Sequence, residues 1–353
     1  MTRRERTLEI ARAAGADGVL AAEPSTVTWL TGYAADIESG PSPFALSPLA
    51  VVVPGTAPIL VVSEDEAVAA AAHGCEVASY PGFTVDPLDP VAGAARALAV
   101  AADGRTLATE PGALPAALAA QVASVDAASA LARARAVKDA DEIVLLRAAL
   151  ELCDTGQREA RTRAEAGMTE IELWAAVRGA VERAAGERTP LLADLASGER
   201  TGATGGPPGT RLLAEGDLVL CDLVPRRAGY WGDSCATFAV GEPSATARAK
   251  HREAAEALTR GIEAVRPGLR SGDLDELVRA GLDYPHHSGH GLGTSWHEEP
   301  RIVPRGETVL EAGMVLALEP AVYGGDEGVR VEQVVLVTVD GCELLSGHSV
   351  ELR

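Results

Sequence analysis

Two distant stretches of the sequence share a pattern that ends in acidic residues. Each begins with a glycine, continues as an apolar strand and reaches an acid six residues on, Asp222 in the first and Glu319 in the second. Each then turns back to a second acid, Asp233 or Glu332, so both are predicted to be β-hairpins with one carboxylate on each strand. Because burying a carboxylate is costly unless something neutralises it, two such hairpins packed together would require cations.

A glycine-rich segment adds imidazoles to this set. It holds four of the seven histidines within twelve residues, and its glycines would let the backbone approach a ligand closely. On the hairpins alone, a shared metal site and two unrelated hairpins with exposed acids are equally favoured; the histidines favour the shared site. Those four histidines are His286, His287, His290 and His297. The others are predicted to be structural or surface residues: His73, His251 and His348.

The elements that must position these residues follow from helix signals and apolar runs. Capping-box patterns at 139–142 and 169–172 each predict the start of an amphipathic helix, the second with Ile171 among its apolar residues. Helices followed by long hairpins predict an α+β domain in which helices cover one face of an antiparallel sheet. Further helices are expected near 245–265 and 272–280, and strands at 217–224, 230–240, 314–319 and 330–338.

The first third of the chain alternates helix and strand signals, which predicts a smaller α/β domain. A further helix is expected to begin at Ser63, with three acids in its first turn, where they suit the helix dipole. Since 353 residues are many for one core, we expect two domains, residues 1–130 and 131–353. The other elements expected in the first are a helix at 3–14, strands at 17–22 and 106–109, and a hairpin from 49–53 and 58–62.

Composition narrows the class of protein. The formal net charge of -20 argues against nucleic acid or an anionic membrane as a partner, because phosphates would be repelled. No segment resembles a membrane span or a signal peptide, so a cytoplasmic enzyme is expected. The five cysteines are scattered without CxxC spacing, which indicates neither a disulfide framework nor a zinc knuckle.

The ordered set of motifs resembles the aminopeptidase P/prolidase group of the M24 "pita-bread" metallopeptidases. Its parts are Asp222 and Asp233 with ten residues between them, Gly-His290-Gly-Leu-Gly, His297-Glu-Glu-Pro, Leu-Glu319-Pro and Val-Arg330-Val-Glu332. The similarity spans residues 130–350, and residues 29–33 resemble part of that group's N-terminal domain. The resemblance implies a pita-bread catalytic domain with pseudo-two-fold symmetry, its helices on a curved antiparallel sheet, preceded by a smaller creatinase/prolidase-like α/β domain.

The same resemblance implies a dinuclear metal site. Asp222 would bind one metal, His290 and Glu319 the other, and Asp233 and Glu332 would bridge both. Four carboxylates and one imidazole favour Mn²⁺, with Co²⁺ or Zn²⁺ as alternatives. A metal-bridging hydroxide would attack the scissile carbonyl, with Glu319 as proton shuttle. A homodimer that acts on a small peptide or other small molecule is expected.

Residues on the substrate side are implied less uniformly. His297 resembles the family histidine that stabilises the oxyanion, His286 matches a second substrate-side histidine, and His287 has no assigned role. Strand alternation puts Arg330 on the same face as Glu332, where it would bind a substrate carboxylate, orient the acids or form a structural ion pair.

Three positions depart from the family pattern. Gly205 stands where a substrate-contacting histidine is usual, and we expect its loop to be set back from the metals, with weak activity on ordinary Xaa-Pro dipeptides. Cys235 begins a Cys-Ala-Thr run in place of Thr-Arg-Thr, and strand alternation predicts its thiol near the metals. Gln333 replaces an aspartate.

The leading functional hypothesis is hydrolysis of Xaa-Pro bonds in dipeptides or longer peptides. A C–N hydrolase or lyase acting on a small non-peptide molecule is the alternative on the same fold. An inactive binding protein is less favoured, because all five ligand positions are filled.

Overall fold

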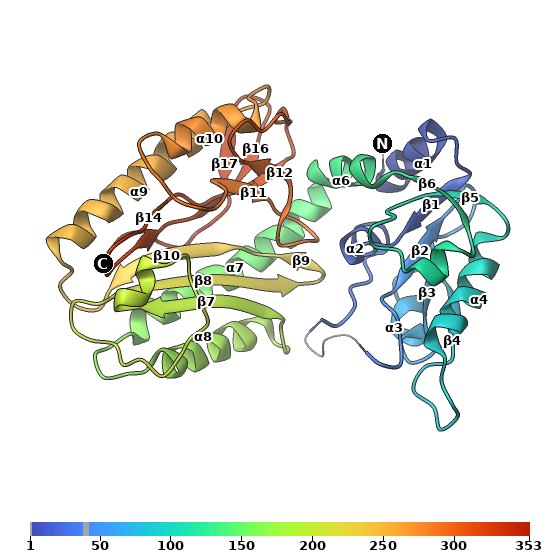
Figure 1. Ribbon diagram of the computed structural model, residues 1–353, viewed down its shortest axis with the longest axis horizontal. Helices are drawn as coiled ribbons and strands as arrows, with labels where there is room; N and C mark the ends of the chain where they lie inside the picture. The colour runs from blue at the N-terminus through green and yellow to red at the C-terminus, as the bar shows by residue number, and fades with distance from the viewer. Residues whose placement is uncertain (1, 38–41) are drawn as a thin grey trace. The chain divides into compact units, whose positions relative to one another are not determined.

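The computed structural model describes residues 2–37 and 42–353, and it divides into two compact units, Met1–Arg135 and Ala136–Arg353 (Figure 1). The division falls five residues beyond the boundary expected from the sequence. No helix in the described part of the chain combines the length and apolar character that crossing a bilayer demands.

A six-stranded mixed sheet in the order β4-β3-β2-β1-β5-β6 forms the centre of the first unit. The antiparallel β2–β3 hairpin confirms the one predicted around Pro54. The strands are β1 Gly18–Ala21, β2 Leu49–Val52, β3 Ile59–Ser63, β4 Glu76–Tyr80, β5 Thr106–Thr109 and β6 Ala123–Asp126. The helices are α1 Arg3–Ala13, α2 Pro24–Thr31, α3 Ala67–Ala71, α4 Pro90–Ala102, α5 Ala116–Ala119 and α6 Ala128–Ala136.

Both faces of this sheet are covered. Leu20 and Val51 pack with Leu98 of α4 on one face, while Val19 packs with Leu131 of α6 on the other. Successive strand residues point to opposite faces, so the short apolar runs supply both layers. The unit is therefore a three-layer α/β structure.

The helix expected from Ser63 begins later than predicted. Ser63 is the last residue of β3 and pairs with Tyr80, and α3 starts only at Ala67. The Asp65 carboxylate accepts a hydrogen bond from the backbone N–H of Phe83, 2.6 Å away, so it holds a turn and does not cap a helix. Strand pairing has overridden the local helix signal.

The second unit contains two main antiparallel sheets, β10-β8-β7 and β12-β11-β13-β16-β17. Their strands are β7 Leu191–Ser197, β8 Leu218–Arg227, β10 Ser234–Ala239, β11 Gly289–Gly291, β12 Glu298–Ile302, β13 Val315–Leu318, β16 Gln333–Val337 and β17 Cys342–Leu344. The short pieces are β9 Tyr230–Trp231, β14 Ala321–Val322, β15 Val329–Arg330 and the 3₁₀ turn η1 Gly198–Gly202. The helices are α7 Ala140–Arg163, α8 Glu170–Ala185, α9 Ala245–Ala264 and α10 Ser271–Arg279.

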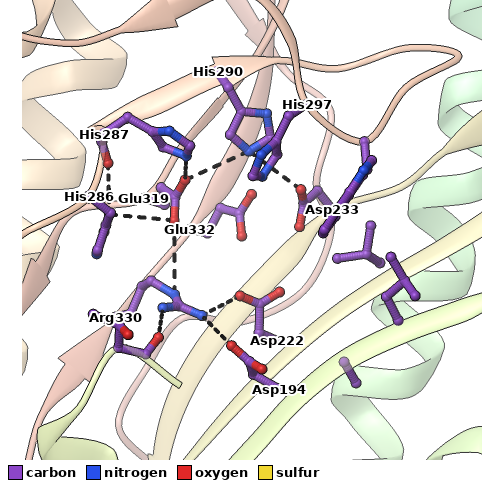
Figure 2. A pocket seen from close by; sticks show the side chains of 15 residues that line it. Asp194, Asp222, Asp233, His286, His287, His290, His297, Glu319, Arg330 and Glu332 are labelled. Atoms are coloured by element: carbon purple, nitrogen blue, oxygen red, sulfur yellow. Dashed lines mark hydrogen bonds and ion pairs between the residues drawn. The ribbon is translucent and has the colours of Figure 1, made fainter. Parts of the chain in front are cut away.

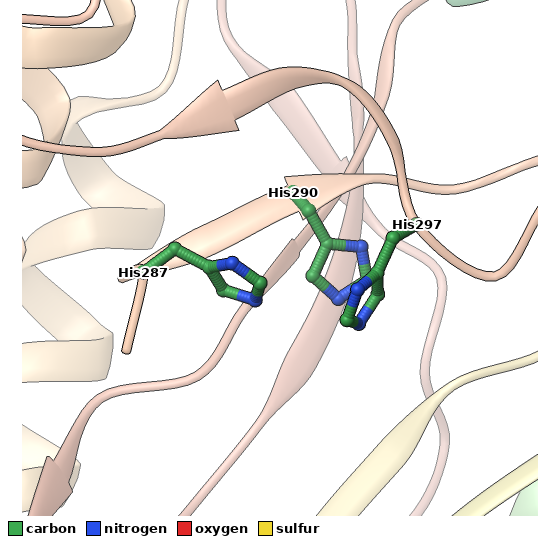
Figure 3. Close-up of side chains that lie close together, drawn as sticks. All are labelled: His287, His290 and His297. Carbon is green, nitrogen blue, oxygen red and sulfur yellow. The ribbon is translucent and has the colours of Figure 1, made fainter. Parts of the chain in front are cut away.

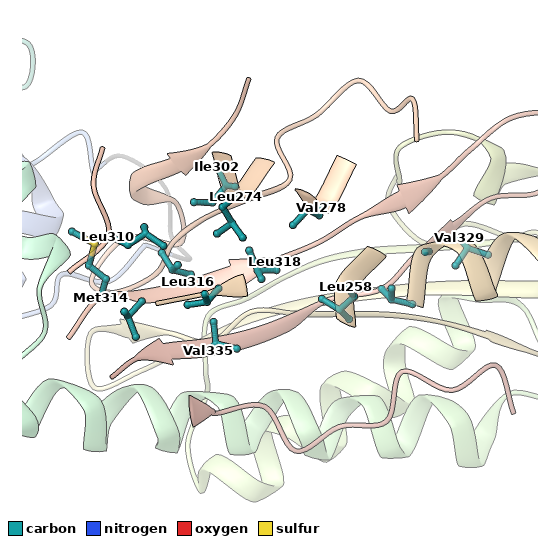
Figure 4. Close-up of a cluster of buried hydrophobic side chains, with 14 of the residues drawn as sticks. Leu258, Leu274, Val278, Ile302, Leu310, Met314, Leu316, Leu318, Val329 and Val335 are labelled. Carbon is teal, nitrogen blue, oxygen red and sulfur yellow. The ribbon is translucent and has the colours of Figure 1, made fainter. Parts of the chain in front are cut away.

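Helices α8, α9 and α10 each pack on one face of a sheet in this unit. Val177 of α8 packs on Leu223 of β8, whereas Leu258 of α9 and Leu274 of α10 pack on Leu318 of β13 (Figure 4). The two sheets meet where the backbone N–H of Glu332 donates to the carbonyl of Cys235, 2.8 Å away.

Most predicted elements of this unit are confirmed, with three corrections. Both capping boxes are present, at the starts of α7 and α8. The strand expected at 230–240 is broken at 232–233, and that at 330–338 is broken at 331–332, so Asp233 and Glu332 lie at breaks and not within strands. Ile171, assigned to the apolar face of α8, is 43% exposed.

Candidate metal centre

A cavity of about 460 Å³ lies where the two sheets of the second unit meet. Every one of the five predicted metal ligands lines it, as do His286, His297 and Arg330. Figure 2 shows the carboxylates of both hairpins pointing into the same space from opposite sides. The structure thus brings together all the residues that the sequence singled out for the site.

The two hairpins deliver their acids in slightly different registers. Asp222 on β8 is paired with Cys235 on β10, so Asp233 is its diagonal neighbour. In the second hairpin Leu318 pairs with Gln333 and Ala321 with Arg330, and the same register places Glu319 directly opposite Glu332. The internal similarity read from the sequence is therefore approximate.

His290 presents one ring nitrogen to this group of acids. Its Nδ1 lies 2.9 Å from the carbonyl oxygen of Gly291, which leaves Nε2 3.5 Å from Asp233 Oδ2 and 3.7 Å from Glu319 Oε1. Burial lowers the pKa of His290 to about 3, so the ring is neutral, the form that binds a metal. Asp233, His290 and Glu332 offer ligand atoms that all lie within 4.8 Å of one another.

The acids of this site are incompletely paired for groups so buried, although Asp222 accepts from Arg330. Burial and the nearby carboxylates raise the pKa of Asp233 and of Glu332 well above the usual range, and raise that of Asp222 to about 6. Oε1 of Glu332 is buried without a hydrogen-bond partner. Unpaired carboxylate oxygens around a neutral imidazole nitrogen are a donor set that fits hard divalent cations.

Glu319 differs from the other acids because cationic and donor groups surround it. Burial raises its pKa, but the hydrogen bond from His287 and the charge of Arg330 outweigh burial and lower the pKa to about 2. His287 Nε2 lies 2.7 Å from Glu319 Oε1. His287, for which the sequence suggested no role, is therefore nearer to Glu319 than His286, whose Nδ1 is 3.8 Å away.

Hydrogen bonds to other residues hold the guanidinium of Arg330 in place. Its guanidinium donates to Asp222 Oδ2, to the carbonyl of Thr204 and to the hydroxyl of Tyr323, the last at 3.0 Å. The Thr237 hydroxyl holds its backbone from both sides, accepting from Arg330 N at 3.0 Å and donating to Arg330 O at 2.9 Å. This geometry matches the role of orienting an acid, one of the three weighed for Arg330.

The histidine segment is fixed by contacts outside the cavity. His287, His290 and His297 lie side by side (Figure 3), with ring centroids 5.1 Å apart for the first two and 4.0 Å apart for the last two. Behind them Ser288 donates to the buried Asp275 at 2.6 Å, which ties the segment to α10.

A buried ion pair anchors the loop that carries His297. Lys138 Nζ lies 2.9 Å from Glu298 Oε2, and the same carboxylate accepts from the backbone of Ser295 at 3.0 Å. The loop also places Trp296 in a stack on His297, with ring centroids 4.9 Å apart.

One expectation about the departures from the family pattern is wrong. The loop at 204–206 is not set back, because Thr204 lines the cavity and its carbonyl accepts from Arg330. Cys235 is fully buried directly opposite Asp222, with its thiol 3.8 Å from the carbonyl of Arg330, so it lies beside the ligand acids although the cavity lining does not include it. The third departure, Gln333, donates to the carbonyl of His348 at 3.1 Å.

Asp194 is an acid of the cavity that the sequence did not predict. It lies on β7 directly opposite Asp222, and its side chain lines the cavity. The available signal was a single aspartate within the run Leu-Leu-Ala-Asp-Leu-Ala, which is weak because one acid in a strand usually faces solvent.

The comparisons with known proteins agree with this geometry. Residues 144–339 match the model of metallopeptidase family M24, and residues 3–145 match the creatinase/prolidase N-terminal domain. The Xaa-Pro dipeptidase of Pyrococcus furiosus is 34% identical over 226 residues, 62% of this chain and 65% of that relative. The chain thus aligns with less than two thirds of the length of the curated relatives it matches.

Solved structures cover nearly all of the chain. The prolidase of Pyrococcus horikoshii superimposes with a TM-score of 0.84 at 25% identity, covering 99% of both chains. The dipeptidase PepE of Mycobacterium ulcerans gives 0.80 at 27% identity, covering 99% of this chain and 96% of that one. With the family model matching more than half of its length, this protein belongs to metallopeptidase family M24 and carries a creatinase/prolidase N-terminal domain.

Proposed function

We propose that this protein is a dinuclear metal-dependent peptidase that hydrolyses Xaa-Pro bonds. The observation that carries the proposal is the convergence of four carboxylates and His290 Nε2 on one cavity, with an oxygen of Glu332 left without a partner. The substrate class is supported by relatives named as Xaa-Pro dipeptidase and prolidase.

The ligand assignment we propose is the one that the resemblance to the family implies. Asp222 would hold one ion, His290 and Glu319 the second, and Asp233 and Glu332 both. Mn²⁺ is the ion we expect, with Co²⁺ or Zn²⁺ as alternatives, since the donors are mostly oxygen. Two divalent cations held there would supply the Lewis acidity needed for water to attack a peptide carbonyl.

The protein's own groups would manage protons and charge around that attack. Glu319, held ionised by His287, would take a proton from the attacking water on a carboxylate oxygen and pass it to the leaving nitrogen. His297, at the cavity wall, would donate to the carbonyl oxygen as negative charge develops there. His286 would contact the substrate, while its Nε2 is held 3.0 Å from the Tyr323 hydroxyl.

The setting we propose is a cytoplasmic homodimer acting on small peptides. The net charge of -20 argues against nucleic acid as a partner.

Chelation followed by metal replacement tests the proposal. Metal-free protein should hydrolyse neither Leu-Pro nor Ala-Pro, and Mn²⁺ or Co²⁺ should restore both activities. Glu319→Gln should stay inactive with metal, whereas Glu199→Gln, an exposed acid outside the cavity, should match wild type. Full activity without metal would overturn the metal mechanism. Turnover of small non-peptide amides but of no Xaa-Pro peptide would favour the C–N hydrolase alternative.

A further inference from the structure

Asp194 is a cavity acid that the proposed mechanism leaves without a role. Among the described residues it is the one acid lining the cavity besides the four proposed metal ligands. Its side chain is 39% exposed, compared with 17% for Asp222 on the neighbouring strand. A carboxylate with this exposure can be reached by a group that enters the cavity.

The negative charge of Asp194 is only partly offset by the protein. The nearest cation is Arg330, whose Nη2 is 3.7 Å away, beyond hydrogen-bond distance. The terminal nitrogens of Arg330 already donate to Asp222, the Thr204 carbonyl and Tyr323. No hydrogen bond to the Asp194 side chain occurs within residues 2–37 and 42–353.

The backbone opposite is shaped to admit this carboxylate. Gly205 has φ +141°, a conformation that other residues rarely adopt, and a Cβ there would overlap the carboxylate of Asp194. The absence of a side chain at 205 is therefore what lets Asp194 face the cavity. The family pattern places a histidine side chain at 205. Here the Asp194 carboxylate, a negatively charged hydrogen-bond acceptor, occupies the space next to that position.

An apolar wall continues from Asp194 along the cavity. Leu192 precedes it by two residues on the same face of β7, Val224 pairs with Leu192 from β8, and Trp296 lines the same cavity. Residues i and i+2 of a strand lie roughly 7 Å apart, about the reach of a lysine or arginine stem with its charged end. The wall and the acid together match a side chain that is aliphatic along its length and cationic at its tip.

We propose that Asp194 is a specificity-determining residue that selects peptides carrying a lysine or arginine side chain. This inference rests on the proposed peptidase function and names the substrate class of the same site. The aliphatic stem lies along Leu192 and the charged end donates to the Asp194 carboxylate. A charge-assisted hydrogen bond of this kind changes specificity by roughly tenfold or more.

The test uses the Mn²⁺-loaded full chain and two pairs of peptides that differ in one charge. Arg-Pro is compared with citrulline-Pro, and Leu-Pro-Arg with Leu-Pro-citrulline, because citrulline keeps the shape of arginine without its charge. Leu-Pro is the reference substrate. Each is assayed with wild type, Asp194→Asn, Gly205→Ala and the control Glu199→Gln, which removes one exposed negative charge outside the cavity.

We expect wild type to favour the arginine peptide of at least one pair by about tenfold in kcat/KM, mainly through KM. Asp194→Asn should abolish that preference and leave Leu-Pro within about threefold, and Glu199→Gln should keep it. Gly205→Ala should weaken the preference by displacing the carboxylate.

Three results would overturn the inference: no charge preference in wild type, a preference that survives in Asp194→Asn, or an equal loss of kcat on every peptide. The last would mean that Asp194 acts through Arg330 and the metal ligands. If Leu-Pro is hydrolysed and charge makes no difference, only this inference falls. If no peptide is hydrolysed, the proposed function falls with it.

Discussion

Both units of this protein bury carboxylates, and Glu110 of the first unit is satisfied in a different way from the cavity acids of the second. In the first unit Glu110, 4% exposed, accepts from the backbone N–H groups of Ala22 and Glu23 at 3.1 and 3.0 Å and from the Thr26 hydroxyl. Arg135 lies 3.5 Å away. In the second unit Asp233 and Glu332 are as buried, yet they face other acids, and one oxygen of Glu332 has no partner.

The difference teaches how to separate a structural acid from a functional one. Burial alone does not distinguish Glu110 from Glu332, since it raises the pKa of both. What distinguishes them is the count of donors, complete around Glu110 and incomplete around Glu332. An incomplete set is costly in the protein alone and becomes favourable when a cation binds.

The largest effect should come from removing an acid with the incomplete set. Asp233→Asn should lower activity by at least about 100-fold, because even outer partners of metal ligands commonly account for about 10- to 100-fold. Metal content, measured by mass spectrometry, should fall with activity. The metal-free variant should unfold at no lower denaturant concentration than metal-free wild type, because asparagine keeps the shape of an aspartate that burial already holds in its neutral form. A variant that kept its metal would contradict the contrast drawn with Glu110.

The reverse result is expected in the first unit. Glu110→Gln places an NH₂ group against N–H donors and should lower the free energy of unfolding by about 1–3 kcal/mol. Activity per folded molecule should not change, and the exposed Glu9→Gln in α1 should leave stability unaltered. Denaturant titration measures the first effect. Loss of metal or of kcat in Glu110→Gln would show that the two kinds of acid are not separable.

Metal binding should depend on pH in the direction set by the raised pKa values. Asp233 and Glu332, whose pKa values are raised well above the usual range, retain protons in the metal-free protein, and Asp222, with a pKa of about 6, takes one up as the pH falls towards that value; a cation must displace these protons. Mn²⁺ affinity should therefore fall as pH drops, about tenfold per pH unit for each proton released. Calorimetry in buffers of different ionisation enthalpy counts those protons. Binding without proton release would mean that the acids are already ionised.

The smallest effect should come from a residue that touches no substrate. Thr237→Val removes the hydroxyl that holds the backbone of Arg330 and should lower kcat roughly tenfold with little change in KM. Thr237→Ser keeps the hydroxyl and should restore most of kcat. A serine variant as impaired as the valine variant would show that the hydroxyl is not what supports kcat.

Much of the site could be predicted from the sequence because its acids stand out at the ends of apolar strands. Asp222 and Glu319 end such runs, and an acid there has few explanations other than a hairpin end or a ligand. The capping boxes that start α7 and α8 were equally readable, since their side chains bond within one turn.

The residues that were missed depend on contacts far along the chain. Asp194 reads as an ordinary strand residue until β7 is paired with β8 opposite Asp222. The role of His287 could not be told apart from that of His286 in the sequence. The backbone direction at 286–287 decides which of the two rings contacts Glu319. Ser63 was misread because pairing with Tyr80 in β4 outweighed a local helix signal.

The fit between Gly205 and Asp194 also constrains the order in which such a cavity can change. A side chain at 205 would overlap the carboxylate of Asp194 in its present position. An aspartate at 194 can therefore take up that position only when residue 205 is already glycine. Glycine at 205, in contrast, leaves many residues acceptable at 194. The two positions are therefore epistatic: once the acid is in place, a side chain introduced at 205 must both displace the carboxylate and adopt a strained backbone conformation. A change of specificity made by this route is therefore harder to reverse than to make.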